Sequence, residues 1–378
     1  MACKKGDVVL VTGASGFLGQ HILKQLQRDA TVSEIRALDK VPLDDYSIVG
    51  SCGDDYCSKI NFFINNLLDV EECRSVFLNT DIVIHCAALV SYDFPPNYEE
   101  LQKNNVDATE NVIHLCIEQN VQRLIYCSTT EVTLTSYVKY GMIAIVIYQQ
   151  ESKVGVPEDE RRLMMGAYAI SKLRAEKIVL KANGQFLSNG TEKLKTVSIR
   201  PTILYGDGDT TFISRILKYG KSRGNILPRI GGKGGKQQMT YVGNAAWGFI
   251  CAKNTLRDRP DSIAGLPVII TDDNDVNDIG RFCERITTKS DNYIKRSSWW
   301  IPLPISYTIA LFIEFIMNVS NKFIGKLPIS PTSLISYLGS VFLYNRSRAA
   351  IHLDYSPIYS SHESMELSRK YYQSLLTH

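Results

Sequence analysis

Tyr168 and Lys172 stand four residues apart at the start of an amphipathic stretch that reaches Leu180. Four residues along an α-helix rise about 6 Å, just over one turn, so both side chains share a face of the helix. A phenol with its ordinary pKa of about 10 is a poor base at neutral pH, and a neighbouring ammonium lowers that pKa. We therefore expect Tyr168 to exchange a proton with a substrate hydroxyl, with Lys172 as its activator. The alternative is a plain amphipathic helix face.

A third catalytic group is expected from residues 124–130 (LIYCSTT), a short apolar run that ends in three hydroxyl residues. In α/β sheets the carboxyl ends of the strands face the ligand crevice. A hydroxyl at that edge can hold a substrate oxygen, and Ser128, Thr129 and Thr130 are the three candidates. Neighbouring side chains of a regular strand point to opposite sides, so Ser128 and Thr129 do not both face the crevice.

A glycine-rich loop connects the first apolar run, residues 8–11, to a helical pattern. It reads TGASGFLG over residues 12–19, with glycines at 13, 16 and 19. Glycine permits a tight turn and a close approach of backbone N–H groups to a pyrophosphate, and the helix N-terminus adds partial positive charge. A lone glycine triplet is a weak signal, but its place between a strand and a helix predicts a dinucleotide site. The residues expected to touch the dinucleotide are Gly13, Ser15, Gly16, Phe17, Leu18 and Gly19.

The second apolar run ends at Asp39, twenty residues after Gly19. An acid at this offset accepts hydrogen bonds from the ribose 2′-hydroxyl of the adenosine half. Its charge would repel a 2′-phosphate, so we expect NAD rather than NADP. Lys40 weakens this preference for NAD, because a cation beside the acid reduces the repulsion of a 2′-phosphate. A solvated charge at the end of a strand is the alternative for Asp39.

Six short apolar runs alternate with helical patterns through the first two-thirds of the chain. This alternation predicts an α/β fold with a doubly wound parallel Rossmann sheet and helices on both faces. We expect a dinucleotide-binding domain over residues 1–205, and a smaller substrate-binding and membrane-contact region over 206–378, some strands of which can return to the first domain. The expected strands are 8–11, 35–38, 60–64, 82–84, 124–126 and 197–199.

The composition excludes several classes of protein. Hydrophobic residues make up 44% of the 378-residue chain and charged residues 21%, as in ordinary globular proteins. The net charge of +3 gives no basis for nucleic-acid binding. The nine cysteines include no Cys-x-x-Cys pair, so we expect free thiols in a reducing compartment and no metal site. The start of the chain lacks the pattern of a secretory signal, so we expect a protein that is not secreted.

A hydrophobic segment covers residues 297–324. Its first part, 297–313, carries no charge and contains Trp299 and Trp300, which suit the boundary between water and lipid. A bilayer span needs about 20 apolar residues. This run is shorter, and Pro302 and Pro304 disturb its start. We expect contact with a membrane surface, with a buried helix and a true span as the alternatives.

These motifs resemble the extended short-chain dehydrogenases/reductases, and within them the 3β-hydroxysteroid dehydrogenase/Δ5-Δ4 isomerase family. The likeness covers most of the chain, but related sterol and sugar enzymes share many of its positions. The residues that carry it are 11–20 (VTGASGFLGQ), 34–40 (EIRALDK), 105–109 (NVDAT), 125–132 (IYCSTTEV), 168–172 (YAISK), 200–206 (RPTILYG), 241–247 (YVGNAAW) and 349–360 (AAIHLDYSPIYS).

The resemblance assigns roles to individual residues. It makes Tyr168 the proton-transferring phenol and Lys172 its activator and a ligand of the nicotinamide ribose. The catalytic hydroxyl falls on Thr129, where the family usually has serine. An acid that touches adenine in the family is replaced here by Asn66, with Leu67 beside it. The resemblance also implies that Asn105 supports the active-site helix.

One segment departs from the family pattern. Residues 142–148 (MIAIVIY) form an apolar run where the family commonly has a glycine-containing turn and polar residues. The run can line an apolar substrate cleft, cover the active site, form an extra strand, or be a sequence artefact.

The function implied is NAD-dependent oxidation of a 3β-hydroxysteroid to the 3-ketosteroid, with Δ5-Δ4 isomerisation. Decarboxylating oxidation of a sterol 4-carboxylate and nucleotide-sugar epimerisation are the enzymatic alternatives. An NAD(H)-responsive binding protein on a degenerate dehydrogenase scaffold is the non-enzymatic one. The resemblance also implies a steroid or sterol as partner, and the cytosolic face of the endoplasmic reticulum membrane or a mitochondrial membrane as location. A homodimer remains open.

Overall fold

The computed structural model is built around a seven-stranded sheet in which all neighbouring strands are parallel. Its order, β12-β7-β5-β4-β1-β2-β3, changes direction at β1, as in a doubly wound Rossmann sheet. The expected fold class is therefore confirmed. The structure describes residues 6–43, 59–138, 142–149, 157, 159–231, 234–288, 293–319 and 325–377.

Each strand near the centre of this sheet is a short apolar run buried from both sides. Leu10, Ile84 and Ile125 have no exposed surface. A parallel sheet covered on both faces requires such runs. All six expected strands are present, and one more joins them from the segment after residue 205. The strands are β1 (Asp7–Thr12), β2 (Val32–Asp39), β3 (Ile60–Ile64), β4 (Ile82–His85), β5 (Arg123–Cys127), β7 (Lys195–Pro201) and β12 (Pro267–Ile270).

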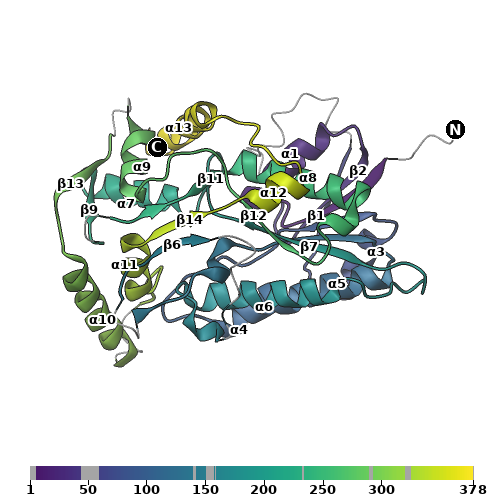
Figure 1. Ribbon diagram of the computed structural model, residues 1–378, viewed down its shortest axis with the longest axis horizontal. Helices are drawn as coiled ribbons and strands as arrows, with labels where there is room; N and C mark the ends of the chain where they lie inside the picture. The colour runs from purple at the N-terminus through teal and green to yellow at the C-terminus, as the bar shows by residue number, and fades with distance from the viewer. Residues whose placement is uncertain are drawn as a thin grey trace.

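Helices cover both faces of the sheet (Figure 1). One layer contains α1, α8 and α12, and the other contains α3, α5 and α6. The parallel strands need these crossovers, because each chain segment must return to the same edge before the next strand begins. The helices of the two layers are α1 (Phe17–Gln27), α3 (Val70–Phe77), α4 (Tyr98–Leu101), α5 (Ala108–Glu118), α6 (Gly166–Ala182), α8 (Val242–Asp258) and α12 (Ser347–His352), with a π-helical turn η2 (Gln102–Asp107) before α5.

A second region contains three small parallel sheets, ordered β10-β14-β6, β11-β8 and β13-β9. This region is not continuous in the sequence. Its strand β6 comes from the first 205 residues. Conversely, β12 joins the main sheet and α8 covers that sheet, although both follow residue 205. Its strands are β6 (Val146–Gln149), β8 (Ile203–Tyr205), β9 (Ile226–Arg229), β10 (Lys236–Gln237), β11 (Met239–Tyr241), β13 (Lys295–Trp300) and β14 (Val341–Tyr344). Its helices are α7 (Ile213–Ser222), α9 (Ile279–Thr287), α10 (Leu303–Val319), α11 (Pro331–Gly339) and α13 (Ser361–Thr377), and the short helical turns are η3 (Thr130–Thr133), η5 (Glu160–Arg162) and η6 (Pro260–Ser262).

The apolar run at 142–148 contributes an extra strand. Its second half forms β6, which pairs with β14, and Val146 and Tyr148 are exposed by 78% and 58%. Gln149 at the end of β6 donates from Nε2 to the carbonyl of Thr133, 3.1 Å away. The structure therefore contains the extra strand, which braces the turn that follows β5.

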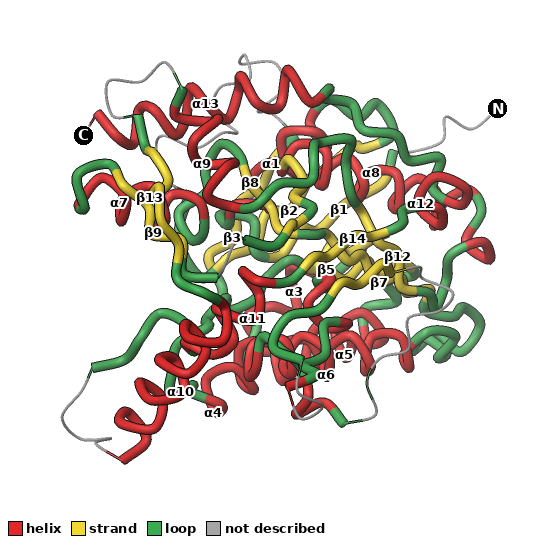
Figure 2. The backbone as a smooth tube through the Cα atoms, turned by 60° about the vertical axis from the view of Figure 1, so that its left-hand side comes forward, coloured by secondary structure: helices red, strands yellow, loops and turns green. Residues whose placement is uncertain are grey.

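The hydrophobic segment forms α10, which extends away from the body of the molecule (Figure 2). Only Ser306, Ala310 and Met317 are buried in this helix, so it is not the buried helix considered as an alternative. Glu314 fastens α10 to α11 by accepting a hydrogen bond from the backbone N–H of Thr332 at 2.9 Å. Among the described residues, no helix is both long and apolar enough to cross a bilayer.

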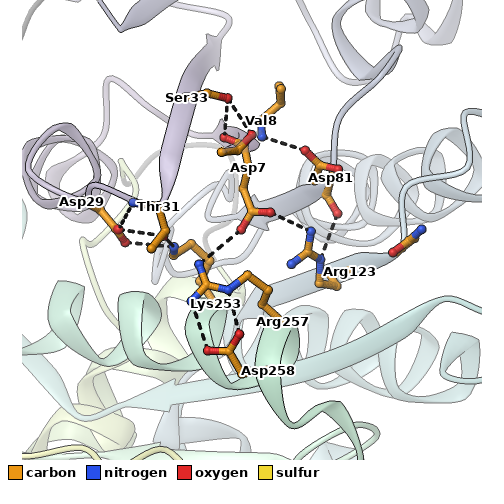
Figure 3. Close-up of polar contacts among 12 residues, drawn as sticks. Asp7, Val8, Asp29, Thr31, Ser33, Asp81, Arg123, Lys253, Arg257 and Asp258 are labelled. Atoms are coloured by element: carbon orange, nitrogen blue, oxygen red, sulfur yellow. Dashed lines mark hydrogen bonds and ion pairs between the residues drawn. The ribbon is translucent and has the colours of Figure 1, made fainter. Parts of the chain in front are cut away.

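A network of charges closes the amino-terminal edge of the sheet, where β1 and β5 begin (Figure 3). Lys253 of α8 has no exposed surface, and its Nζ lies 2.8 Å from a carboxylate oxygen of Asp29. Arg123 at the start of β5 pairs with Asp7 at the start of β1 at 3.1 Å. The buried cation of α8 therefore ties that helix to the turn between α1 and β2.

We expect Lys253→Met to lower the free energy of unfolding by about 3 kcal/mol, because one half of a buried ion pair is left without its partner. Chemical denaturation measures this loss. Asp29→Asn in the same chain should restore part of it. Lys195→Met is the matched control, since its partner Asp261 is 90% exposed and such a pair contributes at most about 1 kcal/mol. Equal losses in the two single variants would contradict the role given to Lys253.

Candidate active site

The glycine loop lies at the carboxyl end of β1 and is built on close backbone contacts. Gly13 has φ +71°, and a Cβ on it would lie 2.6 Å from the backbone nitrogen of Ala87. A Cβ on Gly19 would lie 2.1 Å from the carbonyl oxygen of Gly13. Real Cβ atoms do not approach backbone so closely, so both positions require glycine. The contacts bring the first turn of α1 directly over the end of β1.

This loop leaves donors for an anion. Gly16 is the N-cap of α1 and has no side chain to cap the helix. The first N–H groups of a helix have no partner within it, so those of Phe17 and Leu18 point to the space in front of α1. Gly16 is exposed there, while the side chain of Leu18 is buried beneath. An uncapped helix N-terminus above a glycine loop fits a pyrophosphate group.

Asp39 lies against the same loop. Its Oδ2 accepts a hydrogen bond from the backbone N–H of Ser15 at 3.0 Å, and its Oδ1 accepts from Val41 at 3.2 Å. The carboxylate is therefore held at the place where a ribose bound to the loop would present its hydroxyls. The neighbouring Lys40 donates a hydrogen bond from Nζ to Asn104 Oδ1 at 3.2 Å.

The expected adenine contacts follow β3, next to the end of β2. Asn66 is exposed, and its Oδ1 accepts a hydrogen bond from the backbone N–H of Leu68 at 3.1 Å. Leu67 is buried in the core beneath α3 and α5, and its carbonyl accepts from Asn111 at 2.9 Å. Asn66 therefore offers a side-chain amide to a ligand, whereas Leu67 offers only backbone. Both assignments stay predictions.

Tyr168 and Lys172 share one face of α6 as expected, and both are buried. Asn105 of η2 positions this helix by donating from Nδ2 to Ser171 Oγ at 2.9 Å. Ser171 in turn donates to the carbonyl of Tyr168 at 2.7 Å. The support role implied for Asn105 is thus present in the structure as a direct contact.

The expected lowering of the Tyr168 pKa by Lys172 is not present in this arrangement, and the activating role of Lys172 stays a prediction. Burial raises the pKa of Tyr168 well above its ordinary value, and the charges of Glu131 and Cys127 raise it further. Lys172 donates from Nζ to the carbonyl of Cys127 at 2.6 Å and lies 4.4 Å from the centre of the Tyr126 ring. Its ammonium is therefore engaged by the end of β5, and burial lowers its own pKa. Spacing along a helix brought the two side chains to one face but did not decide their electrostatics.

The three candidate hydroxyls at the end of β5 lie in different surroundings. Ser128 is buried, and its hydroxyl lies near the carboxylate of Glu176, whose pKa it helps to lower. Thr130 is buried and donates weakly to the carbonyl of Pro201 at 3.4 Å. Thr129 is half-buried, and its Oγ1 accepts from the backbone N–H of Glu131 at 3.3 Å, which leaves its own proton free to donate. The structure favours Thr129 among the three, and its catalytic role stays a prediction.

A buried carboxyl group lies beside these residues and was not expected from the sequence. Both carboxylate oxygens of Glu131 accept from the hydroxyl of Tyr92, at 2.9 and 3.0 Å. The ring of Tyr92 packs edge-on against that of Tyr168, with 5.0 Å between ring centres. Burial raises the pKa of Glu131 to about 7, against the lowering effect of the Tyr92 hydrogen bond. A titratable acid thus shares an aromatic cluster with the candidate catalytic phenol.

We expect Glu131→Gln to change how stability depends on pH. The folded protein holds the Glu131 proton more tightly than the unfolded chain does, because the pKa of this carboxyl is raised from 4.5 to about 7. The wild type should therefore lose about 3 kcal/mol relative to the glutamine variant as pH rises from 4.5 through 7. Denaturant titrations of both proteins across this range measure the difference. A constant difference would mean that Glu131 is ionised throughout.

Solved structures similar to this chain include epimerases and complexes with NAD. UDP-glucuronic acid 4-epimerase from Bacillus cereus in complex with NAD is 16% identical, with a TM-score of 0.66 over 97% of this chain and 99% of that one. MoeE5 in complex with UDP-glucuronic acid and NAD is 18% identical, with a TM-score of 0.66 over 98% and 99%. The epimerase Mth375 from Methanothermobacter thermautotrophicus is 16% identical, with a TM-score of 0.69 over 98% and 93%. At these identities the likeness establishes the fold.

A family model matches the chain over residues 10–304, which include the glycine loop, Asp39, the end of β5 and the Tyr168–Lys172 pair. The match covers well over half of the sequence, and the site just described lies entirely within it. The chain belongs to the 3-beta hydroxysteroid dehydrogenase/isomerase family of nicotinamide-dependent enzymes.

Proposed function

We propose that this protein oxidises the 3β-hydroxyl of a steroid to a ketone with NAD as the acceptor, and that Δ5-Δ4 isomerisation follows in the same site. The observation that carries the proposal is the convergence of Tyr168, Lys172 and Thr129 at the edge of the sheet that also bears the glycine loop. Family membership supports the reaction class.

The residues that would hold NAD all lie along one edge. Backbone N–H groups at the start of α1 suit its pyrophosphate, and the Asp39 carboxylate suits the adenosine ribose. We assign NAD rather than NADP, because Asp39 is held at the loop by Ser15 while Lys40 is engaged by Asn104. When bound, the nicotinamide ring accepts a hydride from the substrate carbon.

The protein's part in oxidation is to hold the hydroxyl and take its proton. Thr129 donates its free proton to the substrate oxygen, and Tyr168 receives the hydroxyl proton. The raised pKa of Tyr168 must fall for this to occur near neutral pH. Lys172 can lower it by leaving the carbonyl of Cys127, because an ammonium close to the phenol favours the phenolate.

We expect Tyr168→Phe to reduce steroid oxidation by about 100-fold or more, since a positioned acid or base contributes 10²–10⁴ in rate. NAD binding should stay close to that of the wild type, because the phenol hydroxyl lies outside the glycine loop. Turnover is followed as NADH formed from a 3β-hydroxy-Δ5 steroid, and binding by titration with NAD alone.

The same assay separates the alternatives. A 4-carboxysterol and a UDP-sugar are offered as competing substrates to the wild-type protein. Turnover of the carboxysterol in preference to the steroid would favour the decarboxylating sterol enzyme. Inhibition or turnover by the UDP-sugar would favour an epimerase. Binding of NAD with turnover of none of them would favour a binding protein on a degenerate scaffold.

We further propose that α10 lies on the surface of a membrane, which would be the cytosolic face of the endoplasmic reticulum or a mitochondrial membrane. Its outward side chains are large and apolar: Ile309, Phe312 and Phe315 are exposed by 48%, 63% and 64%. Trp299, in the strand β13 that precedes α10, is exposed by 67%. Such a face buries apolar area in lipid while Glu314 keeps the helix attached to α11. A lipophilic substrate partitions into the same bilayer.

We expect the double variant Phe312→Ser/Phe315→Ser to bind phosphatidylcholine vesicles about 100-fold more weakly, because two phenyl groups contribute about 3 kcal/mol or more when buried in lipid. Co-sedimentation with vesicles measures the affinity. Ile351→Ser on α12 is the matched control, since Ile351 is exposed by 68% on a helix of the other region. Unchanged binding of the double variant, or equal loss in the control, would contradict the assignment of α10.

A further inference from the structure

Cys86 and Cys127 lie side by side at the carboxyl edge of the sheet. Cys127 is the last residue of β5, and Cys86 directly follows β4. These strands are neighbours and parallel, and His85 pairs with Tyr126, so the next residues in register are the two cysteines. Neighbouring strands are about 4.8 Å apart, which lies within the Cα separation that a disulfide can bridge. The two thiols are close enough for each to shift the pKa of the other, and the Cys127 thiol donates from Sγ to the carbonyl of Ser128 at 3.7 Å.

The pair lies between the glycine loop and the active-site lysine. The backbone N–H of Cys86 donates to the carbonyl of Thr12 at 3.1 Å, and the space beside Gly13 is closed by the backbone of Cys86 and Ala87. On the other side, the carbonyl of Cys127 accepts from Lys172. Both cysteines are half-buried, whereas the other free cysteines of the described part of the chain are buried: Cys73, Cys116, Cys251 and Cys283.

The surroundings shift the pKa values of the two thiols in opposite directions and so give them different roles. The neighbouring Cys86 thiol lowers the pKa of Cys127, and the Lys172 ammonium lowers it further, while burial opposes both. Burial raises the pKa of Cys86, and the nearby Cys127 adds to this rise. The thiolate is the form of cysteine that attacks an oxidant. Cys127 is therefore the attacking sulfur, and Cys86 is the thiol placed to resolve the product.

We propose that Cys86 and Cys127 form a peroxide-sensitive thiol pair at the floor of the cofactor cleft. The Cys127 thiolate attacks one oxygen of hydrogen peroxide, the O–O bond breaks, and with one proton taken up the products are a sulfenic acid and water. The Cys86 thiol then attacks the sulfenic sulfur, its proton and the sulfenic hydroxyl leave as a second water, and an S–S bond forms. In total, two thiols lose two electrons and two protons, and one peroxide becomes two waters.

Formation of the disulfide would affect the active site through Lys172. A disulfide joins the ends of β4 and β5 directly beneath the carbonyl that holds the lysine, so it fixes the edge on which the cofactor lies. A bound cofactor would in turn cover the thiols, and the two events should exclude each other. A disulfide that is partly exposed is also open to attack by a reducing thiol, which makes the change reversible.

The test is peptide mapping by mass spectrometry after treatment of the full-length protein with hydrogen peroxide. We expect a linked pair of peptides containing Cys86 and Cys127, lost again after treatment with dithiothreitol. NAD at 100 times its dissociation constant should slow the linkage about 100-fold, because only about one molecule in 100 is then free of cofactor. Absence of the linked peptides, or linkage of Cys127 to a cysteine other than Cys86, would overturn the proposal.

Two variants make the result specific. Cys86→Ser should form a sulfenic acid at Cys127 that a dimedone probe traps, with no disulfide. Cys116→Ser should form the disulfide at the wild-type rate, since Cys116 is buried in α5 away from the edge. The disulfide is detected without any steroid present. The proposal for the thiol pair can therefore be confirmed even if the proposed steroid oxidation is not. Linkage at an unchanged rate in saturating NAD would overturn the placement of the thiols in the cofactor cleft.

Discussion

The active edge of this protein depends on backbone packed against backbone at the end of β1. Gly19 sits where a Cβ would overlap the carbonyl oxygen of Gly13, and Gly13 sits where a Cβ would meet Ala87. These contacts set how closely α1 approaches the sheet. They also aim the uncapped start of α1, the carboxylate of Asp39 and the end of β4 at one shared space. A larger residue at either position would separate the donors that a pyrophosphate needs.

Burial then decides the chemistry of the groups that surround this space. Tyr168, Lys172 and Glu131 are all removed from water, and the pKa of each shifts toward its neutral form. In apolar surroundings the neutral form of each group has the lower free energy, and neutral groups suit a substrate that carries no charge. In the proposed mechanism, proton transfer requires a charge to be brought close to Tyr168, and Lys172, held on the carbonyl of Cys127, is the residue to which we assign this role.

The second region adapts the shared scaffold at its periphery. The extra strand β6 pairs with β14 and braces the turn after β5 through Gln149. Beyond β13, α10 presents an apolar face that no other described element covers. The similar solved structures share the fold over nearly the whole chain at low identity, and a shared fold does not by itself determine a substrate.

The sequence by itself determined the sheet, the glycine loop, Asp39 and the Tyr168–Lys172 face, because each depends on local periodicity or fixed spacing. It did not reveal Glu131, the partner of Lys172 or the meeting of Cys86 with Cys127, since each joins residues from separate strands and helices. The 40 residues between Cys86 and Cys127 carry no local sign that β4 and β5 are neighbours. Only packing removes these groups from water and sets their charges, so the tertiary structure alone decided the electrostatics of the site.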